Sequence, residues 1–136
     1  MPPQARRPRI GTGRAPMASD SLPGVLCIFE DERFPGFFPL SLGRPVFDIS
    51  IGTQSLRGRL VDELNPESLA LLCRPYLAAV LAEEESREGT RAVRVNELPD
   101  GEILFLNGRL LSYERELGDL CSVLKRDSVL EKKGIV

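Results

Sequence analysis

The apolar run from Gly24 to Phe29 (GVLCIF) constrains the fold of this chain more than any other segment. A short run without polar alternation is typical of a strand that is covered on both faces, as in a parallel sheet. The charged residues Glu30–Arg33 follow directly and end the strand. We therefore expect this segment to lie inside a parallel sheet.

The rest of the chain alternates between helical and extended patterns. A helix is expected after Thr53, which is a good N-cap, and it ends before Asn65-Pro66. A second helix begins at Pro75, and its acidic end, Glu83–Glu85, is interpreted as a solvated face. The other expected elements are strands over 68–73, 90–98 and 102–106, and a helix over 112–125. The order strand, helix, strand, helix, strand, strand, helix predicts a layered α/β fold.

The charge distribution limits the kinds of partner. The chain has 136 residues, the size of one domain. Its net charge is −2, but four arginines against Asp20 give residues 1–20 a charge of +3, which leaves −5 for residues 21–136. Nucleic-acid binding over a broad face requires clustered cations, so we expect no nucleic-acid partner. No apolar run approaches the ~20 residues that cross a bilayer, so we expect no membrane partner.

The two ends of the chain differ from the middle. Residues 1–20 are basic, rich in proline and without a hydrophobic run. We interpret them as a disordered basic tail rather than a secretory signal, and we expect a cytoplasmic protein. The end of the chain, Gly134-Ile135-Val136, is typical of the beginning of a strand. Residues 21–136 are therefore interpreted as the N-terminal part of a larger α/β domain.

Cysteine and histidine usage restricts the chemistry. Cys27, Cys73 and Cys121 lie far apart inside apolar segments, and we expect buried free thiols. A zinc site would need paired Cys or His at close spacing, and the chain has no histidine. The commonest general base and the usual catalytic triads are therefore excluded. Any catalysis would depend on positioning, charge and a metal ion.

Two loops carry the candidate site residues. Ligands of open α/β sheets bind beyond the carboxyl ends of the strands, where both loops are expected. In the first loop, Arg44 precedes Pro45 and either contacts a phosphate or lies in a surface turn, while Asp48 either binds a metal or ribose or caps local backbone N–H groups. In the second loop, Asn107-Gly108-Arg109 forms either a site or a hairpin turn.

The pattern PL-x-x-x-RP-x-x-D-x-x-x-G over residues 39–52, with Phe29-Glu30-Asp31 before it and the LNGRL run over 106–110, resembles a known family. It is similar to the sugar nucleotidyltransferases related to the bifunctional N-acetylglucosamine-1-phosphate uridyltransferases. The resemblance implies a Rossmann-like three-layer sandwich of the nucleotide-diphospho-sugar transferase type, here incomplete at the C-terminus. It also implies transfer of a nucleotidyl group from a nucleoside triphosphate to a sugar 1-phosphate, with release of pyrophosphate and assistance from Mg²⁺.

The resemblance assigns roles to particular residues. Arg44 and Arg109 are the expected catalytic residues, and the expected substrate-binding residues are Arg33, Asp48, Asn107 and Gly108. No metal ligand is identified. The partners are the nucleoside triphosphate and the sugar 1-phosphate, and association into a homo-oligomer through a region after Val136 stays open.

Three departures from the family pattern keep other functions open. The Gly-rich G-x-G-T/S-R-L loop is replaced by EDERFPG over residues 30–36, the lysine after RP by Val46, and the metal-binding Gly-Asp by Asn107-Gly108. Arg33 is a candidate substitute for the arginine of the missing loop. The alternatives are a noncatalytic module that binds a sugar nucleotide or another protein, and a fragment whose function lies in residues outside this chain, which would be inactive alone.

Overall fold

The computed structural model describes residues 23–89, 91–112 and 116–131. The expected tail over residues 1–20 and the chain end Gly134–Val136 lie outside them. In order along the chain, the described residues form β1 (Val25–Phe29), the 3₁₀ helices η1 (Phe34–Phe37) and η2 (Val46–Asp48), the short strands β2 (Ser50–Ile51) and β3 (Gln54–Ser55), α1 (Leu56–Leu64), β4 (Ser68–Leu72), α2 (Pro75–Glu88), β5 (Ala92–Val95), β6 (Ile103–Asn107) and α3 (Glu116–Val123).

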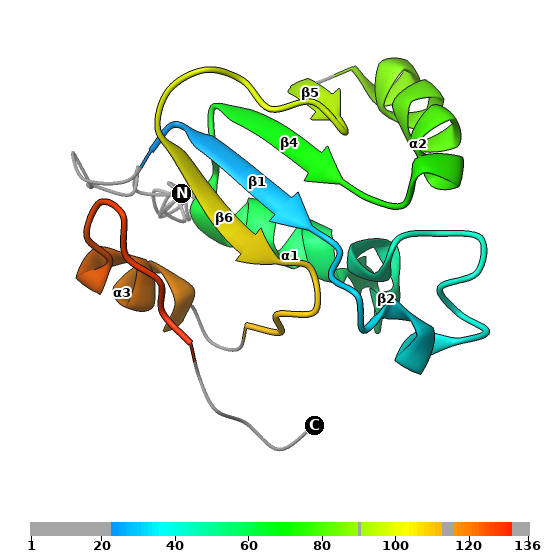
Figure 1. The fold of residues 1–136 in the computed structure, drawn as a ribbon, viewed down its shortest axis with the longest axis horizontal. Helices are drawn as coiled ribbons and strands as arrows, with labels where there is room; N and C mark the ends of the chain where they lie inside the picture. The colour runs from blue at the N-terminus through cyan, green and yellow to red at the C-terminus, as the bar shows by residue number, and fades with distance from the viewer. Residues whose placement is uncertain (1–22, 90, 113–115, 132–136) are drawn as a thin grey trace, which may run out of the picture.

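Four of the described strands form one parallel sheet in the order β5-β4-β1-β6, with β1 inside it (Figure 1). Helices α1 and α2 connect β1 to β4 and β4 to β5, which are the crossovers that parallel strands require. The chain then returns to add β6 on the other side of β1, so Phe29 pairs with Asn107 at the carboxyl ends of the two strands. This reversal of strand order is where open α/β sheets bind ligands. The Rossmann-like α/β class expected from the sequence is confirmed.

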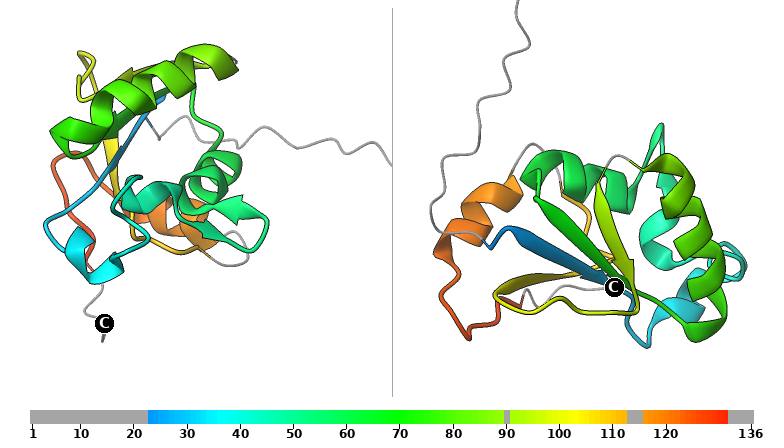
Figure 2. Two further views of the ribbon diagram at one scale, coloured as in Figure 1. Left: turned by 90° about the vertical axis from the view of Figure 1, so that its right-hand side faces the viewer. Right: turned by 90° about the horizontal axis from the view of Figure 1, so that it is seen from above.

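The apolar core lies between one face of the sheet and the helices. Figures 1 and 2 show α1, α2 and α3 on the same side of the sheet. The fully or almost fully buried members of the core are Leu26, Ile28, Phe47, Leu60, Leu69, Leu71, Leu81, Leu106, Leu117 and Cys121. Together these elements make one sheet layer and one helix layer, and the third layer of the expected sandwich is not among the described residues.

The opposite face of the sheet is closed partly by small side chains. Cys27 and Ala70 pair across β1 and β4 and are fully buried, whereas Phe105 on β6 is 49% exposed. Burial raises the pKa of the Cys27 thiol to about 11, so the thiol stays protonated at neutral pH. The expectation of buried free thiols is confirmed for Cys27 and Cys121, while Cys73 is half-buried.

The beginning of α1 differs from the sequence prediction. Its N-cap is Ser55, whose Oγ accepts a hydrogen bond from the backbone N of Gly58 at 3.0 Å. Thr53 instead follows Gly52, which has a φ of 72° and turns the chain between β2 and β3. Glycine adopts this left-handed conformation without a steric penalty. The β2–β3 hairpin therefore occupies residues 50–55, and the helix begins after it at Leu56.

One strand and one helix are shorter in the described residues than the sequence predicted. The strand expected over 90–98 is shortened to Ala92–Val95, because Asn96 has a φ of 54° and turns the chain away. The helix expected over 112–125 is described over Glu116–Val123, and Ser112 is not helical. Its first turn is capped by Glu63, which accepts hydrogen bonds from Ser112 Oγ at 2.6 Å and from the backbone N of Leu117 at 2.8 Å. No helix in the described ranges is both long and apolar enough to cross a membrane.

Candidate functional site

A buried ion pair anchors the Arg44 loop at the carboxyl edge of the sheet. Glu30 follows β1 and Arg74 follows β4, and Arg74 Nε lies 2.7 Å from Glu30 Oε1 with the side chains 9% and 2% exposed. The second carboxylate oxygen of Glu30 accepts a hydrogen bond from the backbone N of Val46 at 2.8 Å. Arg74 Nη2 also donates to the backbone carbonyls of Ser41 and Arg44, the latter at 3.1 Å. The Arg74–Glu30 pair thus holds both sides of the Arg44-Pro45 bend, Arg74 before Pro45 and Glu30 after it.

Aromatic side chains complete the packing around Arg74. Its guanidinium lies 4.3 Å from the ring centroid of Phe34 and 5.1 Å from that of Tyr76, within cation–π range. The Tyr76 hydroxyl donates to the carbonyl of Leu42 at 3.1 Å, and the buried Ser41 hydroxyl donates to the carbonyl of Phe34 at 2.9 Å. Sequence reasoning missed Arg74; its position between a buried strand and a helix-starting proline was the available signal.

Arg44 itself lies at the rim of this arrangement. Its backbone carbonyl is held by Arg74, but its side chain is exposed and makes no ion pair within the described residues. An exposed guanidinium on a rigid backbone is suited to contact an anion. Both readings of Arg44, a phosphate contact and a surface turn, require this exposure.

A second cluster joins the carboxyl ends of β1 and β6. Arg109 donates from Nε and Nη2 to the carboxylate of Asp31, with Nη2 2.6 Å from Oδ2, and Asn107 Nδ2 donates to Oδ2 at 2.9 Å. Asn107 Oδ1 accepts the backbone N–H of Arg109 at 2.9 Å. Partial burial alone would raise the pKa of Asp31, but the hydrogen bonds from Arg109, Asn107 and the backbone of Arg33 hold it below its usual value. The charge of Arg109 is therefore compensated by Asp31.

Gly108 has a structural role next to this cluster. Its backbone N donates to the carbonyl of Phe29 at 2.8 Å, which brings the loop against the end of β1. A Cβ on Gly108 would lie 2.9 Å from Cβ and Cδ1 of the fully buried Phe47 and 3.1 Å from the Phe29 carbonyl oxygen. The Asn107-Gly108 pair terminates a parallel strand, so the hairpin-turn reading is wrong.

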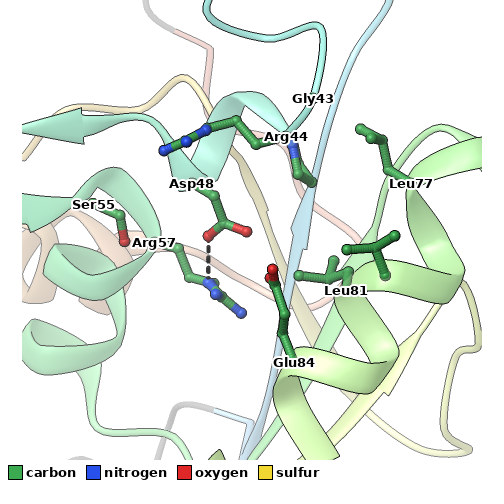
Figure 3. Close-up of a pocket in the computed structure, with 10 residues that line it drawn as sticks. Gly43, Arg44, Asp48, Ser55, Arg57, Leu77, Leu81 and Glu84 are labelled. Atoms are coloured by element: carbon green, nitrogen blue, oxygen red, sulfur yellow. Dashed lines mark ion pairs between the residues drawn. The ribbon is translucent and has the colours of Figure 1, made fainter.

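Asp48 and Arg57 line a cavity of about 310 Å³ between the Arg44 loop, α1 and α2 (Figure 3). Asp48 Oδ1 lies 2.7 Å from Arg57 Nε, without the alignment of a hydrogen bond, and Arg57 also pairs with Glu85. Burial raises the pKa of Asp48 to about 6. The positive charge of Arg57 lowers this pKa, whereas the negative charges of Glu85 and Glu84 raise it further. The carboxylate of Asp48 thus faces a guanidinium instead of capping backbone. The solvated-face prediction is wrong for Glu85, because α1 brings Arg57 to it.

The raised pKa of Asp48 makes stability depend on pH. A carboxyl group that binds its proton more tightly in the folded state stabilises the fold below its ordinary pKa of 3.8, and this contribution is lost as pH rises through about 6. Allowing for partial solvent screening, we expect the free energy of unfolding of Asp48→Asn to rise by roughly 2 kcal/mol relative to the parent protein between pH 4 and pH 7. Urea denaturation across this range measures the difference. Parallel profiles for the two proteins would contradict the prediction.

Arg33 and the expected metal site have less support from the contacts in the structure. The side chain of Arg33 is exposed, and only its backbone N contacts the site, donating to Asp31 Oδ1 at 3.1 Å. Within the described part of the chain, no group of three or more His, Cys, Asp or Glu side chains stands together to hold a metal ion. Since the carboxylate of Asp31 is already occupied by Arg109 and Asn107, these residues do not fit a resident metal site.

Comparison with known proteins assigns the family. The model of the sugar nucleotidyl transferase family matches residues 26–136, from β1 to the end of the chain. The chain belongs to the sugar nucleotidyl transferase family. Comparisons with curated proteins and with solved structures found no significant match. Both loops of the candidate site lie within the region that matches the sugar nucleotidyl transferase family.

Proposed function

We propose that the protein transfers a nucleotidyl group from a nucleoside triphosphate to a sugar 1-phosphate. An oxygen of the sugar phosphate forms a bond to the α-phosphorus, the bond from that phosphorus to the bridging oxygen breaks, and pyrophosphate leaves with the electron pair. Such a displacement requires positioning and charge neutralisation more than a proton shuttle, which suits a chain without histidine. The family match supports nucleotide and sugar phosphate substrates.

The proposal depends on one observation. Two arginine-bearing loops lie at the carboxyl edge of the sheet, one fixed by the buried Arg74–Glu30 pair and the other by the partly buried Arg109–Asp31 pair. Arg44 extends from a backbone that Arg74 and Glu30 hold. Arg109 uses Nε and Nη2 for Asp31, and its Nη1 has no hydrogen-bond partner in the described ranges, so this nitrogen can donate to a phosphate. Asn107 orients Arg109 through its amide. Mg²⁺ would enter with the nucleoside triphosphate as part of the substrate.

We also propose that the chain is related to the bifunctional N-acetylglucosamine-1-phosphate uridyltransferases, on the sequence pattern over residues 39–52. This relation makes UTP with N-acetylglucosamine 1-phosphate the first pair to test. Other nucleoside triphosphates and sugar 1-phosphates follow, each with and without Mg²⁺, and pyrophosphate release is the readout.

We expect Arg44→Ala and Arg109→Ala to lower kcat/KM by about 10–50-fold, the loss of one charge-assisted hydrogen bond. Arg87→Ala is the matched control, because Arg87 is an exposed arginine that pairs with Glu83 on α2. If Arg44→Ala and Arg109→Ala keep full turnover, the site assignment is wrong. If no substrate pair gives turnover, catalysis by this chain is rejected.

A noncatalytic sugar-nucleotide-binding module is the second candidate. It is favoured by the three carboxylates of Glu30-Asp31-Glu32, which occupy the position where related enzymes have a Gly-rich phosphate loop. Calorimetry with nucleotide sugars separates the candidates, since this module would bind without releasing pyrophosphate.

A further inference from the structure

Below Arg44, the cavity is lined by two carboxylates, those of Asp48 and Glu84, and by one guanidinium, that of Arg57. The carboxylates of Asp48 and of the exposed Glu84 point toward one another, and the guanidinium of Arg57 lies beside them (Figure 3). Arg57 is already engaged by Asp48 and Glu85, and the described residues provide no ion-pair partner for Glu84. Asp48 Oδ1 is buried against Arg57 Nε, so the acceptors that remain for a ligand are Asp48 Oδ2 and the carboxylate of Glu84. The interior therefore disfavours anions and offers acceptors to hydroxyl groups.

The wall opposite Asp48 is largely apolar, with Glu84 at one end of it. It is formed by α2, where Leu77 and Leu81 are buried and Val80 is 56% exposed. A sugar ring has hydroxyl groups at its edge and C–H groups on its faces, so it matches a cavity lined by both carboxylates and aliphatic side chains. At about 310 Å³ the cavity is near the lower end of the ~300–1,000 Å³ of small-molecule sites, which suits one sugar unit rather than a whole nucleotide sugar.

The rim of the cavity carries the opposite charge. Arg44 lines the cavity from the loop above, and its guanidinium is exposed and without an ion pair in the residues described. Its backbone is linked through Arg74 to Glu30, the residue before Asp31 of the second cluster. A ligand with hydroxyl groups at one end and a phosphate at the other would match the interior and the rim at once.

We propose that this cavity binds a sugar 1-phosphate, with Asp48 and Glu84 accepting hydrogen bonds from the sugar hydroxyls and Arg44 contacting the phosphate. The inference rests on the proposed function and assigns the cavity to its acceptor substrate. The nucleoside triphosphate, with several negative charges, is excluded from the interior and is left to the Asn107-Arg109 edge.

The test is calorimetric titration of the whole chain with the 1-phosphates of glucose, galactose, mannose and N-acetylglucosamine. We expect at least one to bind more tightly than its free sugar and than inorganic phosphate. Glu84→Gln should weaken that binding about tenfold, since a hydrogen bond to a charged group is replaced by a weaker one. Glu83→Gln is the matched control on the same helix, because Glu83 pairs with Arg87 and does not line the cavity.

A second variant tests shape without charge. Val80→Phe places a larger apolar group at an exposed position of the wall, so it should reduce sugar 1-phosphate binding about tenfold while UTP binding and thermal stability stay unchanged. The inference is overturned if none of the four sugar 1-phosphates binds, if inorganic phosphate binds as tightly as the best of them, or if both variants bind like the parent protein.

The outcomes separate this inference from the proposed function. Binding that depends on Glu84 and Val80, without pyrophosphate release, supports the cavity assignment and rejects catalysis. Turnover with an unchanged KM for the sugar phosphate in both variants supports catalysis and rejects the cavity assignment.

Discussion

Replacing Arg74 by methionine is expected to lower the free energy of unfolding by about 3–5 kcal/mol, because it leaves the carboxylate of Glu30 buried without its partner. Glu30 is 2% exposed, so water cannot replace the lost guanidinium. The carbonyls of Ser41 and Arg44 lose their donor at the same time. Urea denaturation monitored by circular dichroism measures the change.

Two further variants identify the cause of the Arg74 effect. Arg74→Met combined with Glu30→Gln should recover much of the loss, because glutamine is uncharged and still offers an oxygen to the backbone N of Val46. Arg87→Met is the control, since exposed ion pairs on helices contribute only ~0.3–0.5 kcal/mol. An Arg74→Met loss as small as that of Arg87→Met would show that the buried pair does not stabilise the loop.

Gly108→Ala is expected to destabilise the protein by about 3 kcal/mol, at the upper end of the range for overpacking. The new methyl group would meet Phe47 Cβ at 2.9 Å and the Phe29 carbonyl oxygen at 3.1 Å. Neither can move easily, because Phe47 is fully buried and Phe29 belongs to the inner strand β1. Thermal unfolding and pyrophosphate release should both decrease, since the displaced loop carries Asn107 and Arg109.

Gly36→Ala is the matched control for Gly108→Ala. A Cβ on Gly36 meets no atom within 4 Å, so this substitution should leave the melting temperature nearly unchanged. Equal effects of the two substitutions would mean that the contact with Phe47 does not determine the cost at Gly108.

The candidate site was partly predictable from the sequence. The Arg44-Pro45 and Asn107-Gly108-Arg109 loops were expected beyond the carboxyl ends of strands, and the structure has both next to β1. The same patterns could not reveal which partners hold these loops. Arg74 and Glu30 are 44 residues apart in the chain, and Arg109 and Asp31 are 78 apart.

The order and type of the main elements follow from the sequence alone, because apolar spacing, prolines and caps act over a few neighbouring residues. The sequence also establishes that histidine chemistry is excluded and that the arginine-bearing loops follow strands. The pairing of Glu30 with Arg74, of Asp31 with Arg109 and of Asp48 with Arg57 depends on long-range packing. The first two pairings depend on β1 lying between β4 and β6 in parallel register, and the third on how the η2 segment packs against α1. These long-range placements set the charge of each loop, and no local pattern encodes them.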